Sequence, residues 1–488
     1  MLIEAQSLQI MPRRGDSGPR EGGPRVAFVT LGCKVNQSDT QQAIGAFRRA
    51  GCQLVPPTAP ADVYIVNTCS VTHVADRKSR GWLRRVARVN PGALVVATGC
   101  YATSGAAALA EMPEVGLVVT PRQGPELVRL VLEQLPAAIR ARAGAPLSAP
   151  AGTGPERLTP WPDWADPAGA VETDETQIWA VDAGAGLRTR AMIKVEDGCN
   201  DFCTFCIIPF TRGMPRSTPT ALVLDHVRTR LAGGAREIVL TGVHMGKYGS
   251  DHAQRRRSSA DAQEAPDLPA LVRQVLEATA VPRLRLTSLE PTDAAALIPI
   301  FTHPVAAGRL ARHLHLPLQS GCDATLARMR RDYTTAEYAA IVQALRAAVP
   351  DIGITADVIV GFPGETAAEF AATCAFVAGM GFLGVHVFPY SGRPGTPALT
   401  MPDQVDPATR QARHRELTAI GEQGHAAFAT AMLGRVLPVL WEEAGAGGSG
   451  LTDNYLRVRS QAAVPYNTVT AARLTAYDRE GLWADPLA

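Results

Sequence analysis

Short apolar runs, each followed by a segment of helical length, recur along the chain and set its fold class. The first three are Val26–Thr30, Asp62–Asn67 and Ala93–Thr98, with helical-length segments such as Asp39–Ala50 between them. The runs are rich in β-branched residues without polar alternation, which is typical of strands buried on both faces. Strands that alternate with helices predict an α/β fold with a parallel sheet. We therefore expect an amino-terminal parallel-sheet domain over residues 25–135.

A second series of runs extends over residues 187–432 and also alternates with helical-length segments. The predicted strands are Ala191–Glu196, Glu237–Val243, Arg283–Ser288, His313–Leu318, Ile354–Val360 and Gly384–Phe388. Six strand–helix repeats predict a β/α barrel of the TIM type, or part of one. Residues 248–267, with three consecutive arginines, are predicted to be a polar insertion in one loop.

The remaining segments differ in composition from these two series. Residues 1–24 are polar and are expected to be a disordered tail, and the Ala-, Pro- and Gly-rich residues 136–186 are expected to be a linker. Residues 433–488 are predicted to form a small β-barrel from short strands separated by Gly-rich turns. Its predicted strands are Arg435–Trp441, Leu451–Arg459 and Val469–Tyr477.

Composition excludes several classes of protein. Among 488 residues the net charge is +2, so any nucleic-acid binding must come from local basic patches rather than from the whole chain. No apolar run reaches the roughly 18 residues of a membrane span, and the polar amino terminus lacks the apolar core of a secretory signal. We expect a cytoplasmic protein without a membrane partner. In that reducing compartment, nine cysteines favour metal ligation or catalysis over disulfides.

Cys199, Cys203 and Cys206 form a CxxxCxxC motif directly after a predicted strand. Three thiolates this close can hold one soft metal centre. A structural zinc ion or an ordinary iron–sulfur cubane has four protein ligands, so a set of three leaves one coordination position open for chemistry. The alternative is a zinc site that a distant histidine or cysteine completes.

A second set of cysteines follows the first three predicted strands. Cys33, Cys69 and Cys100 each lie one to three residues beyond the end of a strand. Parallel strands present their carboxyl ends at one edge of a sheet, so these thiols are expected to converge. The alternative is three unrelated core cysteines, which is also the interpretation given to Cys52, Cys322 and Cys374.

Two basic segments are candidates for nucleic-acid binding. Arg77, Lys78, Arg80 and Arg84 lie on one predicted helix after Cys69, where spacings of three and four stack like charges that phosphate would neutralise. Tyr455, Arg457 and Arg459 alternate along a predicted strand and are expected to share one face suited to single-stranded RNA. Solvated surface is the alternative interpretation for both segments.

Longer motifs around these cysteines resemble the methylthiotransferase family of radical S-adenosylmethionine enzymes. GCNDFCTFCIIPFTRG (Gly198–Gly213), SLEP (Ser288–Pro291) and LHLPLQSGCD (Leu314–Asp323) resemble its radical domain. LGCKVNQSDT (Leu31–Thr40) and NTCSVTHVADRKSR (Asn67–Arg80) resemble its amino-terminal domain. LTDNYLRV (Leu451–Val458) is similar to the RNA-binding TRAM domain, and the resemblance covers nearly the whole chain outside the tail, linker and insertion.

The resemblance implies two [4Fe–4S] clusters with S-adenosylmethionine as cofactor, and makes all six cysteines metal ligands and catalytic residues. The cluster on Cys199, Cys203 and Cys206 would generate a deoxyadenosyl radical, and the cluster on Cys33, Cys69 and Cys100 would hold the sulfur. By the same resemblance, the residues closest to S-adenosylmethionine are Gly242, His244, Glu290, Gln319 and Asp357. Loop caps and hydrogen bonds inside the barrel are the alternative roles for these residues.

The CKVNQ and CSVT…ADRKSR segments look most like the subfamily that modifies N6-threonylcarbamoyladenosine at position 37 of tRNA, beside the anticodon. This resemblance implies the tRNA anticodon loop, a sulfur donor and an electron donor such as flavodoxin or ferredoxin as partners. The alternatives are an enzyme acting on isopentenyladenosine in tRNA or on a ribosomal protein side chain, and a non-catalytic iron–sulfur protein that binds RNA.

Overall fold

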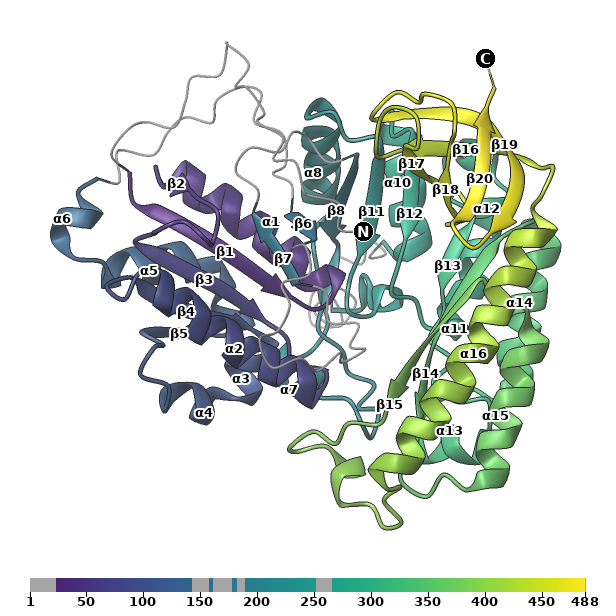
Figure 1. Ribbon diagram of the computed structural model, residues 1–488, viewed down its shortest axis with the longest axis horizontal. Helices are drawn as coiled ribbons and strands as arrows, with labels where there is room; N and C mark the ends of the chain where they lie inside the picture. The colour runs from purple at the N-terminus through teal and green to yellow at the C-terminus, as the bar shows by residue number, and fades with distance from the viewer. Residues whose placement is uncertain (1–22, 143–157, 161–177, 182–188, 252–265, 488) are drawn as a thin grey trace, which may run out of the picture.

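The computed structural model describes residues 23–142, 158–160, 178–181, 189–251 and 266–487. Figure 1 shows an amino-terminal sheet domain beside an open half-barrel, with a small closed barrel at one end of the half-barrel. Most of the predicted tail and most of the predicted insertion lie outside the described residues. Within the described ranges, every helix is too short or too polar to cross a membrane.

The amino-terminal sheet has a parallel core with the strand order β5-β4-β3-β1, and β2 pairs with β1. These strands are β1 (Arg25–Leu31), β2 (Gln53–Leu54), β3 (Val63–Thr68), β4 (Leu94–Gly99) and β5 (Leu117–Val119). One face packs against α1 (Lys34–Arg49) and α5 (Leu127–Gln134). The other face packs against α2 (His73–Val89) and α4 (Ala106–Ala110). Burial on both faces explains why the strands read as continuous apolar runs.

The interval predicted to be a linker contains regular structure. Strand β7 (Ile178–Val181) pairs antiparallel with β1, and β6 (Leu158–Pro160) pairs with β7, so both extend the amino-terminal sheet. A short helix, α6 (Ala137–Arg140), follows α5. These elements were not predicted from the sequence, because a run of four residues among Ala, Pro and Gly carries too little periodicity to identify a strand.

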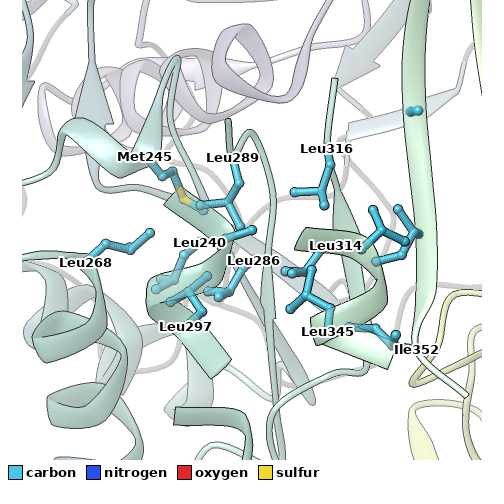
Figure 2. Close-up of a cluster of buried hydrophobic side chains, with 14 of the residues drawn as sticks. Leu240, Met245, Leu268, Leu286, Leu289, Leu297, Leu314, Leu316, Leu345 and Ile352 are labelled. Atoms are coloured by element: carbon cyan, nitrogen blue, oxygen red, sulfur yellow. The ribbon is translucent and has the colours of Figure 1, made fainter. Parts of the chain in front are cut away.

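The second predicted domain, residues 187–432, contains a six-stranded parallel half-barrel, as predicted. It consists of two three-stranded sheets, β8-β11-β12 and β13-β14-β15, and the pairing of Leu284 with Leu310 bridges them. The strands are β8 (Arg190–Lys194), β11 (Glu237–Thr241), β12 (Arg283–Leu286), β13 (His313–His315), β14 (Gly353–Val360) and β15 (Gly384–Pro389). Figure 2 shows the core between strands and outer helices, where Leu240 and Leu314 meet Leu268 and Leu345.

Helices cover the convex side of the half-barrel, in the repeating order expected of β/α units. They are α8 (Thr220–Ala232), α10 (Leu268–Ala278), α13 (Asp323–Met329), α14 (Thr335–Ala348), α15 (Ala367–Met380) and α16 (Pro407–Ala431). Two of them begin with capping boxes, Thr334 with Glu337 and Thr366 with Glu369. These reciprocal hydrogen bonds satisfy backbone donors at the helix starts and so fix where the preceding loops end.

The carboxyl-terminal segment closes into a five-stranded barrel with the order β16-β17-β18-β20-β19. The strands are β16 (Val436–Trp441), β17 (Ser449–Thr452), β18 (Arg457–Arg459), β19 (Thr468–Asp478) and β20 (Gly481–Pro486). The strand predicted over Leu451–Arg459 is therefore two strands, and β20 was not predicted. Between β17 and β18 the chain turns, and Tyr455 takes a left-handed backbone conformation with φ of 79°.

Buried ion pairs join the small barrel to the end of the half-barrel. Glu237 of β11 binds Arg283 and Arg285 of β12, and all three side chains are almost fully buried. Both arginines also donate to backbone carbonyls at the end of β17 and just after it, at Leu451, Thr452 and Asp453, over 3.0–3.2 Å. The two domains consequently share one network of charges.

Candidate functional site

The CxxxCxxC loop follows β8 and the short strand β9 (Glu196–Asp197) and is held on both sides. The backbone N–H of Cys199 donates to the carbonyl of Gly213 at 2.9 Å, and Thr204 Oγ1 donates to the carbonyl of Arg328 at 2.9 Å. Gly198 has φ of 94°, and a Cβ there would lie 2.3 Å from the carbonyl oxygen of Met214. Because glycine has no Cβ, the backbone at the start of this loop can pack directly against the backbone at its end.

The second set of cysteines converges, as the strand-end argument predicted. Cys33 follows β1, Cys69 follows β3, and Cys100 opens α3 (Cys100–Ser104) after β4. Burial raises the pKa of the Cys69 thiol, and the neighbouring Cys100 and Cys33 thiols raise it further. Gly32 leaves room at this point, because a Cβ there would lie 2.6 Å from Cys69 Sγ. Thiols from three strand ends thus lie close enough to influence one another's charge.

Both thiol triads suit an iron–sulfur cluster better than a single zinc ion. Two sulfurs on one zinc, each about 2.3 Å from the metal, cannot lie more than about 4.6 Å apart. In the described part of the chain, the only set of three metal-binding side chains with all ligand atoms within 4.8 Å of one another is Cys199, Asp201 and His244. Neither cysteine triad is contracted to zinc spacing, and soft thiolates are the donors that iron–sulfur clusters take.

His244 lies beside Cys199 and between two carboxylates. Its Nδ1 is 2.7 Å from Asp201 Oδ2 and 3.9 Å from Cys199 Sγ, and its Nε2 is 2.7 Å from Asp293 Oδ2. Burial alone would lower the pKa of this imidazole, but hydrogen bonds to Asp201 and Asp293 raise it to about 11. His244 is therefore an imidazolium at neutral pH, held in one orientation.

Gly242 and Glu196 form the other side of this loop. The backbone N–H of His244 donates to Glu196 Oε2 at 2.8 Å, whereas Glu196 Oε1 has no hydrogen-bond partner within the described ranges. Burial raises the pKa of Glu196 to about 8. A Cβ on Gly242 would lie 3.0 Å from both Glu196 Oε2 and Met245 Cγ, so a side chain at position 242 would displace this carboxyl group.

Glu290 lies on the rim of a cavity of about 210 Å³ that reaches Cys203. It forms an ion pair with Arg331, whose Nη1 is 3.2 Å from Cys203 Sγ. The cavity brings Glu290 together with His244, Asp201 and Asp293. Of the five residues expected near S-adenosylmethionine, His244 and Glu290 line this cavity, and Gly242 shapes the loop beside it.

Gln319 and Asp357 lie elsewhere in the half-barrel. Gln319 follows β13 with φ of 63°, and its backbone bonds to Asp357 and Ile359 join it to β14. Asp357 Oδ2 is 3.2 Å from His315 Nε2. Burial would raise the pKa of Asp357, but the charges of His315, His386 and Lys34 hold it below its ordinary value. Neither residue lines the cavity beside Cys203.

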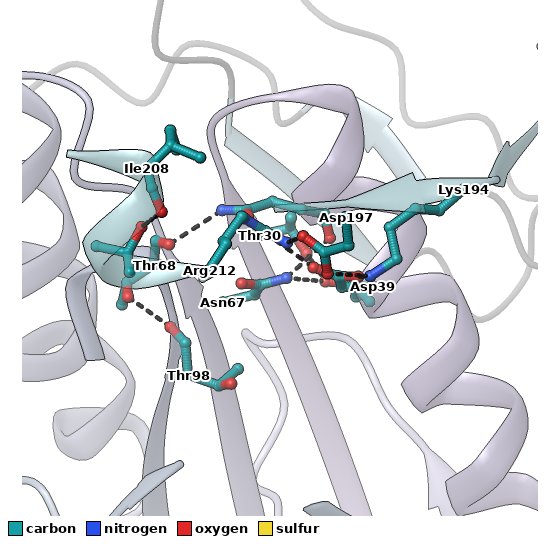
Figure 3. A network of polar contacts seen from close by, with 12 residues as sticks. Thr30, Asp39, Asn67, Thr68, Thr98, Lys194, Asp197, Ile208 and Arg212 are labelled. Carbon is teal, nitrogen blue, oxygen red and sulfur yellow. Dashed lines mark hydrogen bonds and ion pairs between the residues drawn. The ribbon is translucent and has the colours of Figure 1, made fainter. Parts of the chain in front are cut away.

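Arg212, which follows the CxxxCxxC loop in the chain, contacts residues of both domains, and Figure 3 shows it beside Asp39 and Asp197. This buried side chain donates to Asn36 Oδ1 at 2.6 Å and to Asp39 and Asp197 at 2.9 Å each. Burial raises the pKa of the Cys100 thiol, and the guanidinium of Arg212 acts in the opposite direction. Arg212 ends the same motif that supplies Cys199, so a residue of the radical domain stabilises a thiolate of the amino-terminal domain.

The sequence argument missed Arg212 and Arg331, as well as Arg393. Arg393 donates to Ser70 Oγ, next to Cys69, at 3.0 Å and pairs with Asp76. Each arginine lies more than one hundred residues from the cysteine that it approaches. The signal for Arg212 in the sequence is its position inside the motif Gly198–Gly213, whereas Arg331 and Arg393 lie outside the motifs given above.

The predicted RNA-binding residues have different surroundings. On α2, Arg77 and Arg84 are exposed, Arg80 donates to the Tyr101 hydroxyl at 2.6 Å, and Arg84 lies 4.0 Å from Glu114. Lys78 lies on the same helix. Neighbouring groups therefore relieve part of the repulsion between these charges.

On the small barrel, Arg457 and Arg459 are exposed at both ends of β18, and Arg457 Nη2 is 3.2 Å from Glu442 Oε2. Tyr455 does not share their face. Its ring stacks on His313 of the half-barrel with centroids 4.0 Å apart. The prediction of one common face was wrong for Tyr455, because its left-handed turn breaks the strand before Arg457.

Comparison with known proteins agrees with these two sites. Residues 25–120 match the model described as "Uncharacterized protein family UPF0004", and residues 193–377 match the Radical SAM superfamily. The chain is 35% identical over 449 residues to the threonylcarbamoyladenosine tRNA methylthiotransferase MtaB of Bacillus subtilis, covering 89% of each chain. It is also 35% identical to the tRNA-2-methylthio-N(6)-dimethylallyladenosine synthase of Sorangium cellulosum, covering 88% of this chain and 84% of that one. The chain therefore belongs to the methylthiotransferase family of radical S-adenosylmethionine enzymes.

Proposed function

We propose that this methylthiotransferase modifies tRNA, inserting a methylthio group at C2 of N6-threonylcarbamoyladenosine at position 37. The observation that carries the proposal is the presence of one thiol triad in each of two adjoining domains, with Arg212 reaching across their boundary to Asn36 and Cys100. Support for the substrate comes from the relatives named for threonylcarbamoyladenosine, which are 35% and 32% identical over 89% and 90% of this chain.

The enzyme uses two [4Fe–4S] clusters and S-adenosylmethionine. We assign the radical cluster to Cys199, Cys203 and Cys206, and the auxiliary cluster to Cys33, Cys69 and Cys100. When bound there, these groups supply the electron that cleaves S-adenosylmethionine and the sulfur that is transferred. The protein's own part is to place the cofactor and the adenine between the triads and to exclude water.

Three of the candidate cofactor contacts suit the cavity beside Cys203. Glu290, together with Asp201 and Asp293, places carboxylates around it, and these can accept hydrogen bonds from the ammonium group of S-adenosylmethionine. The imidazolium of His244 keeps two of these carboxylates oriented. Gly242 allows the backbone to approach closely. Gln319 and Asp357 are proposed to act at the reacting base instead, inside the half-barrel.

The basic residues offered to RNA are Arg77, Lys78, Arg80 and Arg84 of α2 and Arg457 and Arg459 of the TRAM-like barrel. Phosphates of the anticodon stem-loop are their proposed ligands, because such contacts position an RNA without reading its sequence. We propose a cytoplasmic location because tRNA is the proposed substrate. The reaction also requires a sulfur donor and an electron donor, for which flavodoxin or ferredoxin are the candidates.

Mass spectrometry of tRNA nucleosides from a strain lacking the gene tests the substrate. Loss of the 2-methylthio derivative of threonylcarbamoyladenosine, restored by the wild-type gene but not by Cys203→Ala, is the expected result. Loss of the methylthio derivative of dimethylallyladenosine instead would transfer the assignment to the second type of relative. Unchanged tRNA would refute a tRNA substrate altogether.

A further inference from the structure

Lys34 extends from the amino-terminal domain to the interior of the half-barrel. It is the first residue of α1 and directly follows Cys33. Its Nζ lies 5.9 Å from the centroid of the Tyr455 ring, which belongs to the carboxyl-terminal barrel. The side chain is half-buried, and none of the carboxylates in the described ranges forms an ion pair with it. The Tyr455 ring and the more distant Asp357 offset only part of the desolvation of this charge, so a direct anionic partner would stabilise it further.

The strands facing Lys34 carry a row of polar side chains. Tyr455 stacks on His313, and the hydroxyl of Thr355 lies 3.1 Å from His313 Nε2 and 3.0 Å from His315 Nδ1. The rings of His315 and His386 lie 6.0 Å apart. These side chains come from three adjacent strands, β13, β14 and β15, and from the turn before β18. Together with Lys34 they form the inner polar row: Lys34, His313, His315, Thr355, Asp357, His386 and Tyr455.

The carboxylates near the inner polar row form ion pairs with residues other than Lys34. Asp357 pairs with His315 at 3.2 Å, and Glu237 pairs with Arg283 and Arg285. The guanidinium of Arg285 lies 5.0 Å from the centroid of the Tyr455 ring, which Lys34 also contacts. Asp357 interacts with the charge of Lys34 at a distance, but no direct ion pair between Lys34 and a carboxylate is found in the described ranges. The ammonium group of Lys34 can therefore still accept an anion from a ligand.

The proposed substrate brings such an anion to this place. In N6-threonylcarbamoyladenosine, the substituent on N6 ends in the carboxylate of threonine. C2 and N6 flank N1 on one edge of the adenine ring, so a base with C2 between the thiol triads directs its N6 substituent along that same edge. Lys34 is the residue next to Cys33, one of the triad members, and faces the interior beyond it.

We propose that the ammonium group of Lys34 binds the carboxylate of the threonylcarbamoyl group and so selects this nucleoside over adenosines with an apolar N6 substituent. The inference rests on the proposed function and names the specificity residue of the same site. The hydroxyl of Thr355 and the imidazoles of the inner polar row supply the further donors that amide and hydroxyl oxygens of the substituent require.

Binding of two synthetic anticodon stem-loop RNAs to the full-length holoenzyme tests the proposal. One RNA carries N6-threonylcarbamoyladenosine, and the other carries an analogue in which a primary alcohol replaces the carboxylate. Charge-assisted hydrogen bonds predict that the wild-type protein prefers the carboxylate RNA by about 10- to 100-fold in Kd. A ratio near one with the wild-type protein would overturn the proposal, and this comparison needs no substitution in the protein.

Substitutions then assign the preference to Lys34. Lys34→Gln is expected to bring the ratio of the two Kd values close to one, whereas Lys34→Arg retains the charge and most of the preference. Arg77→Gln serves as the control for general charge, because loss of a phosphate contact weakens both RNAs equally and leaves the ratio unchanged. An unchanged ratio in Lys34→Gln, or equal weakening of both RNAs by that substitution, would overturn the assignment.

Failure of the proposed function would look different. If the wild-type holoenzyme methylthiolates a dimethylallyladenosine stem-loop and not the threonylcarbamoyl one, the substrate is wrong whatever the binding ratio. If it methylthiolates the threonylcarbamoyl RNA while Lys34→Gln still discriminates between the two RNAs, the function stands and the role of Lys34 is wrong.

Discussion

Replacing Glu237 by glutamine is expected to weaken the junction between the half-barrel and the small barrel by about 3 kcal/mol. Burial would raise the pKa of Glu237, but the charges of Arg283 and Arg285 lower it from 4.5 to about 2. This difference of about 2.5 pKa units corresponds to roughly 3 kcal/mol at 1.36 kcal/mol per unit. Removing one partner of a buried ion pair costs about 3–5 kcal/mol in other proteins, which agrees with this value.

The sign of the pH dependence follows from the lowered pKa. A carboxyl group with a depressed pKa stabilises the folded state above its unfolded pKa, and this stabilisation is lost only as the pH falls from about 4.5 towards 2. The effect of Glu237→Gln should therefore be constant between about pH 6 and pH 8.

Hydrogen exchange followed by mass spectrometry measures this effect in the intact protein. Peptides spanning β12 and residues 451–454 should exchange about 100-fold faster in Glu237→Gln, because 3 kcal/mol is about two powers of ten in a local opening equilibrium. Glu442→Gln is the matched control, since Glu442 pairs with Arg190 and Arg457 at a more exposed position, and it should have a smaller effect. An acceleration below about threefold, or one that fades between pH 6 and pH 8, would refute the reasoning.

Three further predictions concern the two sites and the RNA surface. Cys203→Ala and Cys69→Ala should each lower the iron content of the reconstituted protein from about eight to about four atoms per chain, and a single stoichiometric zinc would contradict both assignments. Glu196→Gln should raise the stability of the cofactor-free protein relative to wild type, by up to roughly 1.4 kcal/mol for each pH unit between about pH 5 and pH 8. The raised pKa keeps the Glu196 carboxyl protonated in the folded state, whereas it ionises in the unfolded state. A difference in Tm between the two proteins that does not change with pH would rule this out. Arg457→Ala and Arg459→Ala should each weaken tRNA binding and reduce its salt dependence by about one ion, and an unchanged salt slope would remove β18 from the interface.

Much of the architecture could be predicted because buried strands appear in the sequence as short apolar runs that recur between helical segments. Strands such as β3 and β14 lie in parallel sheets covered by helices, so their residues are apolar over most of their length. Parallel topology then fixes which strand ends are neighbours, and this placed Cys33, Cys69 and Cys100 together without any local motif. The prediction succeeded because strand direction, rather than sequence distance, decides which residues meet.

The errors arise where a local conformation or a distant contact decides the outcome. Leu451–Arg459 has the composition of one strand, but the left-handed conformation of Tyr455 divides it and turns the aromatic ring towards His313. Arg212 shows the other kind of error, because its partners Asn36 and Asp39 lie more than 170 residues away. No spacing rule connects such residues, since the contact exists only after two domains have docked.

The contact of Tyr455 with His313 brings part of the carboxyl-terminal barrel next to the inner polar row. The turn before β18 meets His313 of the half-barrel and Lys34 of the amino-terminal domain. Residues from three parts of the chain therefore meet at the place proposed for the N6 substituent of the base. A substitution in the turn that holds Tyr455 should alter the choice of nucleoside as well as the grip on RNA.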